Sequence, residues 1–278
     1  MATSGSRNWI VTRDNIIHAA LRKLGVNQSS NPPTAEEVQN ASFALNAMVF
    51  AWQNDGVHLW TMAEDILPLT ANTLSVSIDA SVLEVQAPFF RRDDSDSPMT
   101  LLTRDEYLAV PDKKTGGEPT SLYVDYQLAN PTAYLWPRPT YGTTIVTGTD
   151  ALYYLCIKDH TSAAADCPIT GADYATYWQA VSTTPNTVWG AGVSYHSGVV
   201  RYSKVVRLQD FDAAANNPDF PVRWTQALIY GLASNLAPEY PVTQQEKDEM
   251  AQRFQGEYMV ARRVGYDNTD LRFMPSRR

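Results

Sequence analysis

The chain of 278 residues carries 22 Lys and Arg residues against 30 Asp and Glu residues, a formal net charge of −8. This field repels a phosphate backbone, so tight DNA binding is not expected. A hydrophobic content of 44% can fill a core without disulfide bonds. No basic segment followed by an apolar run lies near Met1, and no stretch is long enough to span a bilayer. We therefore expect synthesis in the cytoplasm and no membrane partner.

The first sixty residues predict two amphipathic helices. Thr12 is placed to cap the first helix and Gly25 to end it. Thr34 and Glu37 predict a capping box ahead of the second helix, which Gly56 closes. The two apolar stripes are Ile16, Ile17, Ala20, Leu21 and Leu24, then Val38, Ala41, Leu45, Met48, Val49 and Trp52.

From Ile66 the apolar period changes to two, which predicts strands. A short helix, capped by Thr103 with Glu106 and stopped by Pro111, interrupts them. The predicted strands lie within 66–78, 82–90, 122–126 and 134–136. We expect 143–147 to pair with 199–208, so that the residues between them leave the sheet as an inserted module.

The helical pattern returns near the end of the chain. Pro221 is suited to a first helical turn, and Pro238 breaks that helix. Thr243 and Glu246 form another capping box before a last helix, whose stripe is Met250, Phe254, Tyr258, Ala261 and Val264.

The predicted fold class is α+β, with a helical bundle built from both chain ends, a central β-rich domain and a small inserted β module. The bundle takes 1–62 and 221–265, and the β-rich domain takes 63–147 and 198–220. The module is 148–197. Residues 266–278 form a C-terminal arm.

Four segments, in this order and spacing, resemble the podovirus tail accessory factor family of head-to-tail adaptors. They are Ala20–Val26, Leu45–Met48 with Ala51–Gly56, Leu102–Tyr107 with Tyr134–Pro137, and Tyr230–Ala233 with Asn235–Tyr240. The third of these resembles larger phage adaptors that carry a β domain. The resemblance covers both helical ends and much of the middle. The β region and the module depart from the smallest family members, so their roles do not follow from it.

The resemblance implies a non-enzymatic virion protein at the head-tail junction. It implies a homo-oligomeric, dodecameric ring of helical bundles beneath the portal protein, with tail nozzle or tail fibre proteins on its other face. DNA passes through such a ring without specific binding, and the acidic charge fits this role. No cofactor is implied.

The last residues are rich in arginine and apolar side chains. The resemblance implies an arm that contacts the portal or the next subunit, and a disordered tail is the alternative. The candidate contacts are Arg262, Arg263, Tyr266, Leu271, Arg272, Phe273, Met274, Arg277 and Arg278.

The module resembles small chitin-binding-like carbohydrate-binding modules. Tyr174, Tyr177, Trp178 and Trp189 are the candidate glycan contacts, because aromatic rings stack on the apolar face of a sugar. In the alternative interpretation these rings are the core of a small β domain. The alternative function is accordingly a carbohydrate-binding tail or decoration protein that contacts the host surface.

Other polar side chains suggest weaker candidates for a metal site, a disulfide bond or a catalytic site. Cys156, Cys167 and His160 lack a fourth zinc ligand, although a disulfide between the cysteines stays open. Asp93, Asp94 and Asp96 form either a calcium site or a solvated turn. No phosphate loop, Ser-His motif or paired-carboxylate motif is present, so we expect no catalytic or metal site, and a peptidoglycan hydrolase is the least favoured alternative.

Overall fold

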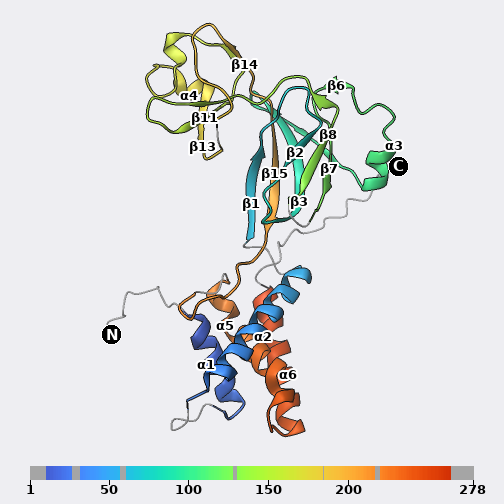
Figure 1. Ribbon diagram of the computed structural model, residues 1–278, viewed down its shortest axis with the longest axis vertical. Coiled ribbons are helices and arrows are strands. Elements are labelled where there is room, and N and C mark those ends of the chain that lie inside the picture. Colours follow the sequence, from blue (N-terminus) through green and yellow to red (C-terminus); the bar gives the residue numbers. More distant parts are fainter. Residues whose placement is uncertain are drawn as a thin grey trace, which may run out of the picture. The chain divides into compact units, whose positions relative to one another are not determined.

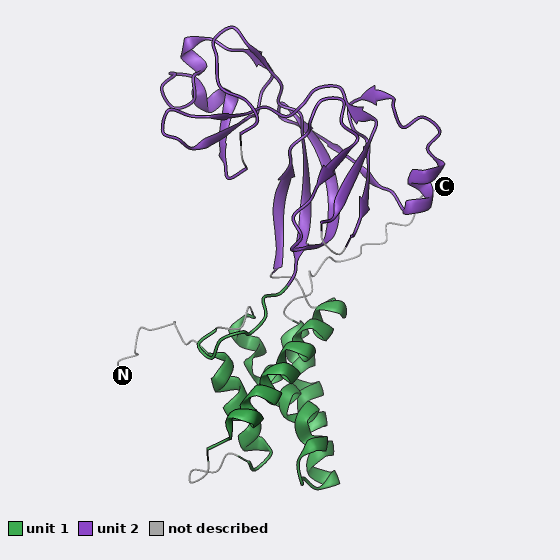
Figure 2. Ribbon diagram, in the orientation of Figure 1, with its two compact units in different colours: residues 1–60, 208–278 green, residues 61–207 purple. Residues whose placement is uncertain are grey.

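The computed structural model describes residues 11–26, 32–56, 61–127, 130–183, 185–216 and 220–263. Within these ranges the chain forms α-helices and several small β-sheets, so the predicted α+β class is confirmed. Figure 2 shows the two compact units: a helical unit, residues 1–60 and 208–278, and a β unit, residues 61–207. None of the helices in the described ranges is long and apolar enough to cross a bilayer.

The helical unit contains four long helices, labelled in Figure 1, in its described part. They are α1 (Arg13–Lys23), α2 (Ala35–Asn54), α5 (Thr225–Leu236) and α6 (Gln244–Arg263), with the 3-10 turns η3 (Val222–Trp224) and η4 (Ala237–Glu239) beside α5. The predicted capping boxes are confirmed. The Glu37 N–H donates to the Thr34 hydroxyl and the Thr34 N–H donates to the Glu37 carboxylate. Thr243 and Glu246 pair in the same way ahead of α6.

Glycine residues end the first two helices as predicted, whereas Pro221 does not begin a helix as predicted. Gly25 and Gly56 follow α1 and α2 with φ of +77° and +82°, a conformation that L side chains rarely adopt. Pro221 does not begin α5. It precedes η3, because the chain makes one tighter turn before α5 starts at Thr225.

The four helices share one hydrophobic cluster. The Trp52 ring stacks on Phe254 with centroids 5.7 Å apart, and its centroid lies 5.8 Å from that of Trp224. The predicted stripes of the first two helices are buried in this cluster, and Val38 packs at its margin. Each large apolar side chain that is buried contributes about 1.5–3 kcal/mol, so packing stabilises these helices more than propensity does.

The chain rejoins the helical unit at Leu208, before the predicted boundary at 221. Leu208 and Phe211 are both buried in the helical cluster. Two amides on α2 hold this segment: the Leu208 N–H donates to Gln53 Oε1 at 3.2 Å, and the Phe211 N–H donates to Asn46 Oδ1 at 2.9 Å. The polar face of α2 thus receives the returning backbone, which the apolar pattern alone does not reveal.

Two four-stranded sheets share one hydrophobic core in the β unit. The first has the antiparallel order β1 (Met62–Leu67), β15 (Val199–Val206), β3 (Val82–Arg92), β4 (Ser95–Pro98). The second has the order β2 (Ser75–Ser77), β8 (Thr132–Trp136), β7 (Ser121–Asp125), β5 (Thr100–Leu101), in which β5 and β7 run parallel. Helix α3 (Arg104–Ala109), with the predicted Thr103 and Glu106 box, and the β6 (Gly116–Gly117) and β9 (Arg138–Pro139) pair complete this part.

The predicted pairing of 143–147 with 199–208 is wrong. Strand β15 has β1 on one edge and β3 on the other, so no edge remains for β10 (Ile145–Thr147). Instead β10 pairs with β11 (Tyr153–Cys156), which pairs with β13 (Trp178–Val181). The pair β12 (His160–Thr161) and β14 (Ser194–Tyr195), helix α4 (Tyr174–Tyr177) and the turn η2 (Ala164–Asp166) lie in the same excursion.

Candidate functional site

The aromatic residues predicted to contact a glycan form or border the core of the excursion between β10 and β15. Trp178 is only 3% exposed and packs with Val146, Tyr154, Cys156 and Tyr195. Tyr174, Tyr177 and Trp189 pack against this cluster and remain partly exposed. A buried indole presents no face to a sugar, so Trp178 is a core residue in this structure. A glycan contact by the other three rings stays a prediction.

His160 lies in a buried polar contact with Asp166. Its Nδ1 atom is 2.8 Å from the Lys158 carbonyl, so Nδ1 carries a proton, and Nε2 lies 3.6 Å from Asp166 Oδ2. The Cys156 sulfur is 3.7 Å from Nδ1. Burial raises the pKa of the Cys156 thiol to about 12, so it is protonated at neutral pH and is a poor nucleophile or metal ligand.

The cysteines do not form the disulfide that the sequence left open, since Cys156 and Cys167 are both free. Over the described part of the chain, no three His, Cys, Asp or Glu side chains converge as a metal site requires.

The three aspartates of the 93–96 turn have separate environments. Asp96 forms a bidentate ion pair with Arg91, with both N···O distances at 2.5 Å. Asp93 turns toward the module, where its Oδ1 accepts from the Asp159 N–H at 2.7 Å and from the Ser197 hydroxyl at 3.0 Å. Asp94 is exposed. Because the carboxylates do not share one centre, the turn is built as a set of hydrogen bonds and not as a calcium loop.

Asp159 is the centre of the polar network that Asp93 enters. Its Oδ2 lies 2.7 Å from Arg92 Nη2, and its Oδ1 accepts from the Ser197 N–H at 2.6 Å. The Ser197 hydroxyl, 2.9 Å from this Oδ1 and 3.0 Å from Asp93 Oδ1, shares its single proton between the two carboxylates. Burial by itself raises the pKa of Asp159, but the hydrogen bonds from Ser197 and Arg92 together outweigh it and lower the pKa to about 2. The carboxylate is therefore ionised at neutral pH and joins the β3–β4 turn to the loops around 159 and 197.

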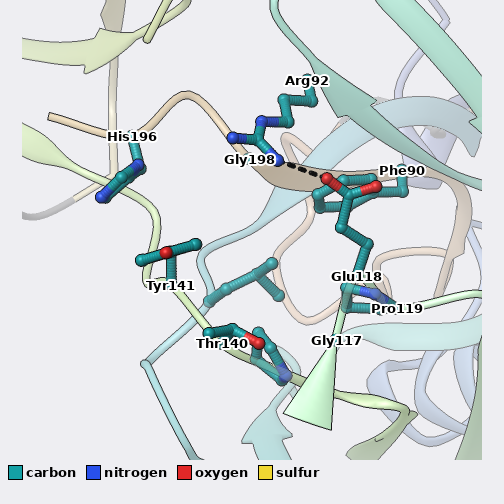
Figure 3. A pocket seen from close by; sticks show the side chains of 11 residues that line it. Phe90, Arg92, Gly117, Glu118, Pro119, Thr140, Tyr141, His196 and Gly198 are labelled. Carbon is teal, nitrogen blue, oxygen red and sulfur yellow. Dashed lines mark hydrogen bonds and ion pairs between the residues drawn. The ribbon is translucent and has the colours of Figure 1, made fainter. Parts of the chain in front are cut away.

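A pocket lies beside this network, within the β unit. Figure 3 shows Arg92 and Glu118 on one side, joined as an ion pair, and His196 with Tyr141 on the other. The Tyr141 and His196 rings stack with centroids 4.1 Å apart and an interplanar angle of 26°. The cavity has a volume of about 160 Å³, and its other walls are Leu69, Phe90, Gly117, Pro119, Pro139, Thr140 and Gly198.

Sequence analysis did not identify this pocket. Its polar residues come from four separate segments: Arg92 from β3, Glu118 after β6, Tyr141 after β9 and His196 after β14. None stands in a recognisable spacing with the others. The one sequence feature that lies close to the pocket is the acidic turn at 93–96. This turn indicates the hydrogen-bond network around Asp159 but not the pocket beside it.

The predicted arm, 266–278, lies outside the described residues, and of the predicted portal or subunit contacts only Arg262 and Arg263 are described. Arg262 and Arg263 form the last turn of α6, where a positive charge interacts favourably with the helix dipole. The other predicted contacts lie outside the described residues; they are Tyr266, Leu271, Arg272, Phe273, Met274, Arg277 and Arg278.

Comparison of the chain with protein-family models and with curated proteins finds no match. The resemblance to the adaptor family therefore rests on the four quoted segments alone.

Proposed function

We propose that the protein is a non-enzymatic head-to-tail adaptor of a short-tailed phage, in which the helical unit is a bundle that assembles into a ring under the portal protein. Three observations support this role: the four segments that resemble the adaptor family, the packing of helices from both chain ends around one cluster, and the uncharged exposed face of α2. The ring joins the portal to tail proteins and lets DNA pass.

The observation that carries the proposal is the exposed face of α2. No charged residue occurs between Val38 and Asn54, although 19% of the chain is charged. Asn40, Phe43, Ala47 and Ala51 are exposed and fall on one face at spacings of three and four. Phe43 is 78% exposed. A surface helix normally turns charged residues to water, so this face is suited to contact with another protein.

A second exposed surface with apolar residues lies on the last turns of α6, flanked by the exposed Arg253 and Arg263. Met259 and Val260 are 60% and 61% exposed, and Gly256 is exposed one turn earlier. A closed ring needs two different surfaces on each subunit, because its contacts are heterologous. We assign the α2 face to one side of each contact and the α6 surface of the next copy to the other. A groove of about 440 Å³ lies beside Phe43, and its border combines Val38 and Phe211 with the polar and charged Asn46, Arg13 and Asp212.

The charge balance supports passage of DNA without retention. With 22 Lys and Arg residues against 30 Asp and Glu residues, the net charge of −8 disfavours retention of a phosphate backbone. Repulsion across a Debye length of about 10 Å at 0.1 M salt keeps a sliding duplex from adhering to the channel.

Mixing the purified chain with the portal protein of its phage tests the proposal. Sedimentation velocity should show a portal complex that carries many copies of the chain. The substitution Phe43→Asp should weaken this assembly at least about tenfold, because a charge placed in an apolar contact must be desolvated. It should change the stability of the free chain by less than about 0.5 kcal/mol, as is usual for an exposed position.

Leu108→Asp provides the matched control. Leu108 is also exposed and apolar, at 59%, but it lies on α3 in the β unit. Wild-type chain that sediments unchanged in the presence of portal contradicts the adaptor role. Normal assembly of Phe43→Asp contradicts the α2 contact.

A further inference from the structure

The pocket between Arg92, Glu118, Tyr141 and His196 combines features that the proposed adaptor role does not use. Its floor is apolar, formed by Leu69, Phe90 and prolines, while ionised groups stand at one side. Such a combination of apolar walls and a few convergent polar groups is typical of small-molecule sites.

Tyr141 forms an aromatic platform at the pocket. The ring is held in place by stacking on His196, yet the residue is 55% exposed. An exposed and immobilised aromatic ring costs little conformational entropy when a ligand covers it. Its electron-rich face attracts polarised C–H groups, which line the apolar face of a pyranose ring.

Arg92 and Glu118 supply hydrogen-bonding groups opposite this platform. Their side chains are 40% and 57% exposed, so their remaining donor and acceptor positions face water. A carboxylate accepts hydrogen bonds from hydroxyl groups and a guanidinium donates to them, and both are charge-assisted. Together they match the neighbouring hydroxyls of a sugar, each of which is a donor and an acceptor.

The local charge selects against anions. His196, the other basic side chain lining the pocket, lies 3.6 Å from Asp159, and Arg92 is shared by the carboxylates of Glu118 and Asp159. With its positive charge already compensated, the pocket has no excess cation for a phosphate or carboxylate. The pocket is therefore suited to polar ligands that carry no net negative charge.

The cavity size limits the ligand to a single ring. Pockets for drug-sized ligands measure roughly 300–1,000 Å³, whereas this cavity measures about 160 Å³. We propose that this pocket binds one neutral saccharide unit, stacked on Tyr141 and hydrogen-bonded to Arg92 and Glu118. This site includes none of Tyr174, Tyr177, Trp178 and Trp189, although His196 at its edge belongs to the 148–197 range.

Saturation-transfer difference NMR on the full chain tests the site with D-glucose, D-galactose and N-acetyl-D-glucosamine as probes. At least one of these sugars should bind. Tyr141→Ala should weaken that binding about tenfold through loss of the stacking surface. Glu118→Gln, which keeps the side-chain shape, should weaken it about threefold to tenfold by removing a charge-assisted acceptor.

Tyr126→Ala is the control, because Tyr126 is similarly exposed at 47% but does not line the pocket. It should bind as the wild type does, and D-glucuronate should bind more weakly than D-glucose. The proposal is overturned if none of the three neutral sugars gives saturation transfer. It is equally overturned if Tyr177→Ala abolishes binding while Tyr141→Ala does not, since the sugar then sits in the module.

Discussion

Asp159 shows how a single carboxylate connects segments that are far apart in the sequence. Through Arg92 and Ser197 it joins residues 67 and 38 positions away, and Asp93 binds its backbone N–H. Each bond to the ionised carboxylate contributes about 1.5–3 kcal/mol at most, because water competes for a group that is one quarter exposed.

The substitution Asp159→Asn should lower the free energy of unfolding of the β unit by about 1–3 kcal/mol at neutral pH. The pKa of Asp159 is lower in the folded chain, about 2, than its ordinary value near 4. Its stabilising effect is therefore complete above about pH 4 and is lost as the pH falls from 4 to 2. Urea unfolding followed by near-UV circular dichroism at several pH values measures both effects.

The exposed neighbour Asp94 provides the control for this experiment, and Asp94→Asn should leave the unfolding midpoint nearly unchanged. If the Asp159→Asn variant is as stable as the wild type at pH 7, and as sensitive to acid, the hydrogen-bond network around Asp159 contributes nothing to the stability of the β unit.

Residue-scale contacts of this kind were the least predictable part of the molecule. The sequence pointed to Asp93, Asp94 and Asp96 as a group because they are close in the chain, but the structure separates them. Likewise the sequence left Trp178 open as either a glycan contact or a core residue, because aromatic rings serve both cores and binding surfaces, and the structure buries it. Nothing in a single sequence distinguishes these two uses when the strand pairing is unknown.

At the scale of elements, sequence motifs correctly predicted the structures whose interactions join residues close together in the chain. The capping boxes of α2, α3 and α6 join residues three positions apart, so the side chains and backbone groups involved are fixed by the sequence. The predicted pairing of 143–147 with 199–208 was wrong because β10 pairs with its neighbour in sequence, β11, and both edges of β15 are occupied by β1 and β3.

Gly231 on α5 illustrates a close contact that packing requires. A Cβ atom there would lie 2.9 Å from Met48 Sδ and 3.1 Å from both the Trp52 and Phe254 rings. Gly231→Ala should therefore destabilise the helical unit by about 1–3 kcal/mol, even though alanine favours a helix. Thermal unfolding followed by far-UV circular dichroism gives the value.

Gly256 on α6 is the matched control, because a Cβ atom there meets nothing within 4 Å. Gly256→Ala should stabilise the chain by about 0.5–1 kcal/mol. If both alanine variants are stabilised equally, the close packing of α5 against α2 and α6 is not a determinant of stability.

At the scale of the whole molecule, composition and periodicity predicted the α+β class, because helical and strand periods occupy separate parts of the chain. The point at which the chain returns to the helical unit was misplaced, since Leu208 and Phe211 lie in an irregular segment without a period. The adaptor role is a proposal that rests on the resemblance and on the uncharged face of α2.

Electron cryo-microscopy of the portal protein mixed with this chain tests the central proposal most directly. The proposal predicts a closed ring of copies on the portal axis, with the α2 face of each helical unit against α6 of its neighbour. Single copies scattered over the portal, or a portal that carries no copies at all, would contradict it.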